Sequence, residues 1–132
     1  MSEFSQYLNL PWVEGGRGPE GYDCYGFVQM IQRVHFGIEM ADVAVPDYDD
    51  GQAILGLITS CGERAEWEPV RIPMHGDIAI VRRPIHVGVW LNIDRGGVLH
   101  CIRGFKVIFS HDSAWHCSGF GRRTFLRHRS RM

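Results

Sequence analysis

The sequence lacks several features that would assign it to a common class. It has no apolar run long enough to cross a membrane, and its first residues lack the basic and apolar segments of a signal peptide. Its formal net charge of −1 gives no overall field that would attract nucleic acid. With 132 residues it has room for one core, so we expect a single domain over 1–132 that is made in the cytoplasm.

Disulfide and metal patterns are also missing. A chain made in a reducing cytoplasm keeps its cysteines as thiols, and no Cys-x2-Cys or His-x3-His spacing indicates zinc. The acidic residues of 47–51 do not have the spacing of a calcium loop, and we expect one of them to cap a helix at about 51–61. We therefore expect no metal and no cofactor. The four cysteines are Cys24, Cys61, Cys101 and Cys117.

The most informative segment is 21–28, where a glycine-rich loop leads into an apolar run with helical period. The spacing predicts a helix over 24–36 that begins at Cys24, with one apolar face and a stop at Gly37. Unpaired N–H groups and the positive end of the dipole favour thiolate at a helix start, and thiolate is the nucleophilic form. The predicted apolar face consists of Cys24, Phe27, Val28, Ile31 and Val34.

After residue 66 the pattern changes to strands. A helix followed by strands favours an α+β domain in which a curved antiparallel sheet packs against the cysteine helix. His86 opens one strand, and His100 lies on the next with Cys101 facing the other way. A helix-start cysteine and histidines on two successive strands can form a thiol triad. The expected strands are at about 67–72, 77–83, 86–93, 97–103, 105–110 and 120–127.

These residues resemble the NlpC/p60 cysteine peptidases of bacterial cell walls. The family's Asp-Cys-x-Gly helix start is matched at 23–26, its upstream glycine-rich element at 15–21, its Gly-Asp strand opening at 76–77 and its His-Val-Gly element at 86–88. The third catalytic position falls on His100. The resemblance spans about 10–116 and implies the papain-like fold of that family.

The resemblance also implies roles for the residues. Cys24 would attack the substrate, His86 would act as its base, and His100 would orient His86. The substrate would be a peptidoglycan stem peptide, cleaved between a D-γ-glutamyl residue and a diamino acid. Three further positions would line the substrate or oxyanion site, namely Trp12, Asp23 and Tyr25.

Two of these positions depart from the usual family pattern. Trp12 stands where many members have an aromatic hydroxyl, and the bulky Tyr25 follows the cysteine where serine is common. A large residue after the cysteine, together with the spacing of His100, Val107 and Trp115, resembles the branch found in phage tails and gene transfer agents. That branch implies tail-tip or hub proteins as partners and the host cell wall as the place of action.

Other interpretations remain open. The chain could be an amidase or acyltransferase of the same thiol fold, or a mainly structural tail-tip protein. His75, two residues before Asp77, could come near the site. The basic cluster at 121–131 could be a solvated edge strand guarded by arginines, or it could contact an anionic wall polymer or a tail partner.

Overall fold

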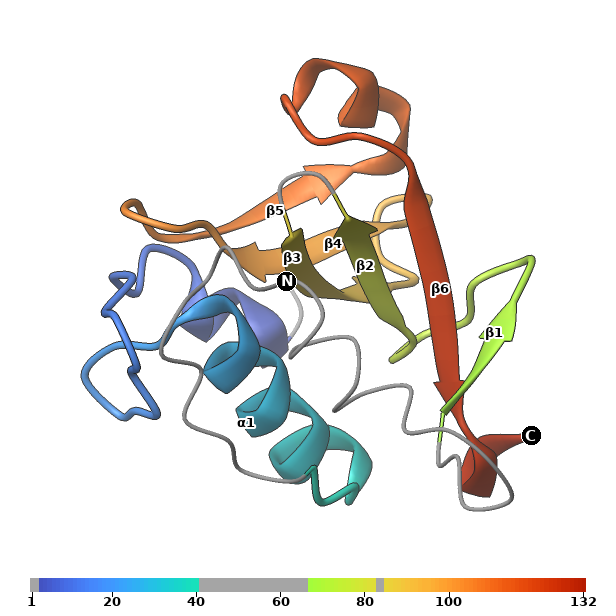
Figure 1. The fold of residues 1–132 in the computed structure, drawn as a ribbon, viewed down its shortest axis with the longest axis horizontal. Helices are drawn as coiled ribbons and strands as arrows, with labels where there is room; N and C mark the ends of the chain where they lie inside the picture. Colours follow the sequence, from blue (N-terminus) through green and yellow to red (C-terminus); the bar gives the residue numbers. More distant parts are fainter. Residues whose placement is uncertain (1–2, 41–66, 83–84) are drawn as a thin grey trace.

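The computed structural model describes residues 3–40, 67–82 and 85–132. It shows a helix packed against one face of a six-stranded sheet (Figure 1). The regular elements are α1 (Cys24–Phe36), β1 (Trp67–Val70), β2 (Ile78–Arg82), β3 (Ile85–Leu91), β4 (Gly97–Cys101), β5 (Val107–His111) and β6 (Arg123–His128). Short 3-10 helices are η1 (Glu3–Tyr7), η2 (Asp112–Cys117) and η3 (Arg129–Arg131). The predicted α+β class is confirmed.

The sheet has the strand order β1-β6-β2-β3-β4-β5, and every pair is antiparallel. Strands β2 to β5 follow one another as hairpins, whereas β6 returns across the sheet to lie between β1 and β2 (Figure 1). The prediction that the basic C-terminal segment is an edge strand is therefore wrong. Pairing between β1 and β6 joins segments far apart in the sequence, and local patterns carry no signal for it.

Helix α1 has the predicted bounds. It ends at Gly37, which adopts the left-handed conformation (φ 67°) and donates its N–H to the Gln32 carbonyl. Most of the predicted apolar face is buried, with Phe27, Val28 and Ile31 fully enclosed. Val34, near the end of the helix, is the exception and is 57% exposed.

Strand β3 is the centre of the molecule because both of its faces are covered. Val87, Val89 and Leu91 pack with α1 in the main hydrophobic cluster. Trp90 joins a second cluster on the opposite face, with Trp115 of η2. Fully burying an aliphatic side chain contributes about 1.5–3 kcal/mol, so the alternating residues of β3 fix its register firmly.

Gly88 of the His-Val-Gly element lies where β3 and β4 come closest. A Cβ at this position would fall 2.5 Å from Val98 Cγ1 and 2.8 Å from His100 Cβ. Real Cβ atoms do not approach side chains of the next strand so closely without displacing them. Glycine here therefore allows β4 to place His100 beside β3.

The expected strands all occur, with ends that differ by a few residues from the sequence prediction. The largest difference is the last strand, which begins at Arg123 because residues 118–122 follow η2 as a loop. The expected helix at 51–61, its acidic cap and Cys61 lie outside the described residues. Within the described part of the chain, no helix has the length and hydropathy needed to cross a membrane.

Candidate active site

The loop before α1 is held by Asp23, the N-cap of the helix. Its side chain is fully buried; Oδ1 accepts the Gly26 N–H at 2.6 Å, and Oδ2 pairs with Arg17 Nη1 at 2.7 Å. A Cβ on Gly26 would lie 2.2 Å from the Gly16 carbonyl oxygen, which explains the glycine of the Asp-Cys-x-Gly element. Asp23 therefore caps the helix and anchors the glycine-rich loop, and its carboxylate does not line a substrate surface.

Cys24 occupies the first position of α1 and is 3% exposed. Burial, and secondarily the Asp23 carboxylate, raise the pKa of its thiol to about 12. Hydrogen bonding from the backbone N–H groups of Val87, Tyr25 and Cys24 itself acts in the opposite direction and lowers this pKa. The helix-start effect expected from the sequence is thus present, but desolvation outweighs it, and the thiol is protonated at neutral pH.

The two candidate histidines lie side by side on neighbouring strands. His86 Nε2 and His100 Nδ1 are 2.7 Å apart. The far nitrogen of His100, Nε2, lies 2.9 Å from the Ser110 hydroxyl on β5. The result is a chain of three polar side chains that crosses β3, β4 and β5.

Aromatic rings pack against the two histidines of this hydrogen-bonded row. The Phe120 ring stacks on His86 with centroids 4.5 Å apart and planes at 9°, and Trp115 lies 5.7 Å from His100. Burial lowers the pKa of His86 to about 4. Burial, together with His86, lowers the pKa of His100 well below its ordinary value. Both imidazoles are therefore neutral at pH 7, and each nitrogen has a definite role as donor or acceptor.

Cys24 approaches β3 from the face opposite to the histidines. It belongs to the main cluster with Val87, while His86 contacts the aromatic rings of the other face. Among the described residues, no hydrogen bond joins Cys24 to His86, so the expected base does not contact the sulfur in this structure. The Val87 N–H that bonds the sulfur follows directly after His86, and His86 Nδ1 has no hydrogen-bond partner within the described residues.

The other two candidate lining residues are Trp12, which precedes the glycine-rich loop, and Tyr25, the second residue of α1. Trp12 is half-buried, packs on the main cluster and donates its backbone N–H to the Phe105 carbonyl at 3.2 Å. Tyr25 is 1% exposed, with the Arg17 guanidinium 5.7 Å above its ring. Tyr25 is therefore a core residue at the base of the glycine-rich loop.

Two further predictions concern neighbours of the site. Cys101 does face away from His100, because it lies in the main cluster and donates its Sγ–H to the Tyr22 carbonyl at 3.3 Å. His75 does not come near His86. Its Nδ1 accepts the Asn92 N–H at 3.0 Å, and Asn92 follows β3 at the end opposite to His86.

Ser110 and Phe120 contact the two histidines but were not among the predicted site residues. A serine within the apolar strand 107–111 is the one local signal for Ser110, since a hydroxyl in such a strand needs a partner. Phe120 lies in a glycine-flanked loop, where no pattern indicates a contact with His86. No group of three or more potential metal ligands is clustered in the described ranges 3–40, 67–82 and 85–132.

Two cavities lie outside the candidate active site. One, of about 650 Å³, lies over β2, β6 and the residues after β1, and the other, of about 290 Å³, lies between η1 and β5. Neither is lined by Cys24, His86 or His100. Cys24, His86 and His100 are buried, and the larger cavity adjoins them through Val81, the cross-strand partner of His86.

Comparison with known proteins supports the fold. No protein-family profile matches the chain. Over 67 residues, or 51% of the chain, it is 28% identical to "Protein P54" of Enterococcus faecium, and the match covers 13% of that protein. It is similar to the crystal structure of the NlpC/p60 domain of the peptidoglycan hydrolase SagA, with a TM-score of 0.58 and 20% identity over 92% of this chain and 90% of that one. The chain therefore has the NlpC/p60 fold, as expected.

The depressed pKa of His86 predicts a loss of stability in mild acid. The unfolded chain binds a proton at His86 below about pH 6.5, whereas the folded chain resists it until about pH 4. His86 alone should therefore lower the free energy of unfolding by about 2 kcal/mol between pH 6.5 and 5, above the range where most carboxylates titrate. Urea denaturation at several pH values measures this change.

Matched variants isolate the contribution of His86. His86→Gln should make the fall in this window smaller by the share of His86 and leave the share of the buried His100, and His116→Gln, at an exposed position, should change it little. A wild-type free energy of unfolding that stays constant from pH 7 to 5 would contradict the buried, neutral imidazole.

Proposed function

We propose that the chain is a cysteine peptidase that hydrolyses amide bonds in peptidoglycan stem peptides. The observation that carries the proposal is the arrangement at β3. Cys24 begins α1 and bonds the backbone directly after His86, and His86 is itself hydrogen-bonded to His100. The shared fold with a peptidoglycan hydrolase domain supports the same conclusion.

The hydrogen bonds suggest how His86 would act. Because Nε2 is engaged by His100, Nδ1 is the nitrogen that would take the proton of the Cys24 thiol. For Nδ1 to carry a lone pair, Nε2–H must donate to His100 Nδ1, and His100 Nε2–H must donate to Ser110 Oγ. The Ser110 hydroxyl can accept this N–H, so it is compatible with the tautomers that the mechanism requires.

The reaction would then proceed through an acyl enzyme. The sulfur attacks the amide carbon as its proton moves to His86, and the N–H groups at the start of α1 stabilise the oxyanion. Imidazolium returns the proton to the leaving amine, and the C–N bond breaks to give a thioester. Water, deprotonated by His86, hydrolyses the thioester and regenerates the thiol.

The uncharged Cys24 thiol and His86 imidazole set two requirements on this mechanism. With the thiol pKa raised to about 12 and the His86 pKa lowered to about 4, proton transfer before attack is unfavourable. Transfer concerted with attack avoids an isolated buried ion pair. Substrate binding must also bring the sulfur and Nδ1 into line, since they are not hydrogen-bonded without it.

We propose the bond between D-glutamate, linked through its γ-carboxyl, and a diamino acid as the one cleaved, from the resemblance to NlpC/p60 peptidases. The same resemblance supports a setting in a phage or phage-like tail, where the enzyme would be carried to the host wall. Tyr25 and Trp115, two of the residues behind that resemblance, have structural roles here. Tyr25 is buried in the core, and Trp115 packs on His100.

The first prediction concerns cleavage itself. Purified peptidoglycan digested by the wild type should release stem-peptide fragments, identified by mass spectrometry. Cys24→Ala should reduce the rate at least about 1,000-fold, because the nucleophile is lost. Cys117→Ala removes an exposed thiol and should change nothing. Equal activity of Cys24→Ala and wild type would refute a thiol mechanism, and activity on simple acyl substrates alone would favour an amidase or acyltransferase.

The second prediction concerns the tautomer. Ser110→Ala removes the hydrogen-bond partner of His100 and should lower kcat about tenfold with little change in KM. Ser110→Thr keeps the hydroxyl and should restore most of kcat. The imidazole ¹⁵N shifts of His86 and His100 should show mixed tautomers in the alanine variant alone. Unaltered shifts in that variant would remove Ser110 from the mechanism.

The third prediction concerns incorporation of the protein into a phage or phage-like tail. If the chain works in a tail, purified particles should contain it, and particles carrying Cys24→Ala should assemble and adsorb normally but deliver DNA poorly. Electron microscopy and an infection assay measure the two steps. Failure of these particles to assemble would favour a structural role instead.

A further inference from the structure

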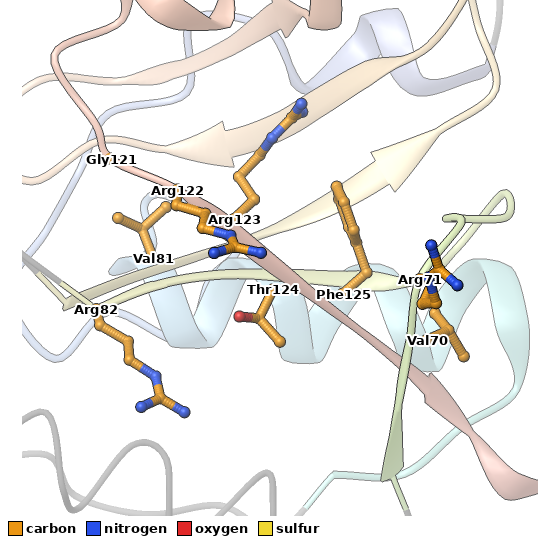
Figure 2. Close-up of a pocket in the computed structure, with 9 residues that line it drawn as sticks. All are labelled: Val70, Arg71, Val81, Arg82, Gly121, Arg122, Arg123, Thr124 and Phe125. Atoms are coloured by element: carbon orange, nitrogen blue, oxygen red, sulfur yellow. The ribbon is translucent and has the colours of Figure 1, made fainter.

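The larger cavity is lined by a group of arginines. It has a volume of about 650 Å³, within the range of pockets that bind small ligands. Its nine lining residues include four arginines and no acidic residue: Val70, Arg71, Val81, Arg82, Gly121, Arg122, Arg123, Thr124 and Phe125 (Figure 2). We refer to it as the arginine pocket.

Three of these arginines are available to a ligand. Arg123 is already engaged, since it pairs with Asp112 and lies over the Trp115 and Phe125 rings. The other three are exposed and form no ion pair with the described residues. Figure 2 shows Arg71 and Arg82 at opposite sides of the pocket with Arg122 between them. Such a group of free guanidinium groups in a concave site is suited to a carboxylate or phosphate.

The arginine pocket adjoins the candidate active site. Val81 on its wall is the direct cross-strand partner of His86. Gly121, also on its wall, follows Phe120, whose ring stacks on His86. A ligand in the pocket therefore lies one strand away from the proposed catalytic base.

The lining favours a short peptide that carries an anionic group. Val70, Val81 and Phe125 give the pocket apolar surface between the arginines, which suits the methyl and methylene groups of a peptide. A duplex nucleic acid needs a broad basic surface, whereas this chain has a net charge of −1 and three of its exposed arginines line one hollow.

We propose that the arginine pocket binds the free α-carboxylate of the glutamyl residue in the wall peptide. This inference rests on the proposed function. A glutamyl residue linked through its γ-carboxyl keeps its α-carboxylate free, so the substrate carries an anion beside the bond to be cut. Arginines one strand from His86 would select for that anion.

The test compares two peptides on the Cys24→Ala chain, which binds without cleavage. The first probe is L-alanyl-D-γ-glutamyl-L-lysine amide, which carries one carboxylate; the second has a carboxamide in its place. We expect the acid to bind about tenfold more tightly by calorimetry at low salt. The combined variant Arg71→Gln, Arg82→Gln and Arg122→Gln should abolish this difference.

Matched controls make the outcome decisive. Arg33→Gln removes an equal charge from an exposed turn of α1 and should keep the tenfold preference. A preference that survives in the combined variant, or equal binding of the two peptides, would overturn the proposal. So would tighter binding of poly(glycerol phosphate) than of the acid peptide to the same arginines.

The result is separable from the proposed function. Cleavage of peptidoglycan that depends on Cys24 but is indifferent to the α-carboxylate would refute the pocket assignment and leave the peptidase intact. Dispersed amide NMR spectra of every variant verify that the chain is folded in each comparison.

Discussion

Strand β3 is covered on both faces, and the placement of the site depends on this constraint. Side chains of a strand alternate between its faces, so His86 must point toward Phe120 and Trp115 if Val87 points toward α1. The N–H of Val87 then reaches the sulfur of Cys24, and the imidazole of His86 reaches His100. The candidate nucleophile and the candidate base thus lie next to the same strand, on opposite faces of it.

Burial governs the chemistry of the site more than the helix end does. The N–H groups at the start of α1 favour thiolate, yet the cost of desolvating a charge is larger, and the resting thiol stays protonated. The same desolvation keeps both histidines neutral. An enclosed, uncharged site is protected from side reactions, and the proton would move only when a substrate supplies an electrophile.

The arginines of the C-terminal segment divide into two groups because β6 is an internal strand. Arg127 pairs with the buried Asp77 at 2.9 Å, and Arg131 lies 3.7 Å from the same carboxylate, so these two fasten the end of the chain to the strand opening at Gly76. Arg122, before β6, instead lines the pocket beside His86. A single basic run in the sequence therefore has a structural part and a part that is free to bind.

The sequence by itself determined the bounds of α1, the approximate strands and the residue types of the site, because helical period and strand alternation depend on neighbours in the chain. Only the tertiary structure decided that β6 is internal, that Phe120 covers His86, that Ser110 partners His100 and that Arg71 and Arg122 line one pocket. Each of these contacts joins residues distant in sequence, and its formation depends on the packing of the whole sheet. The protonation states were likewise decided by the tertiary structure, since burial outweighs the local helix-end effect that the sequence reveals.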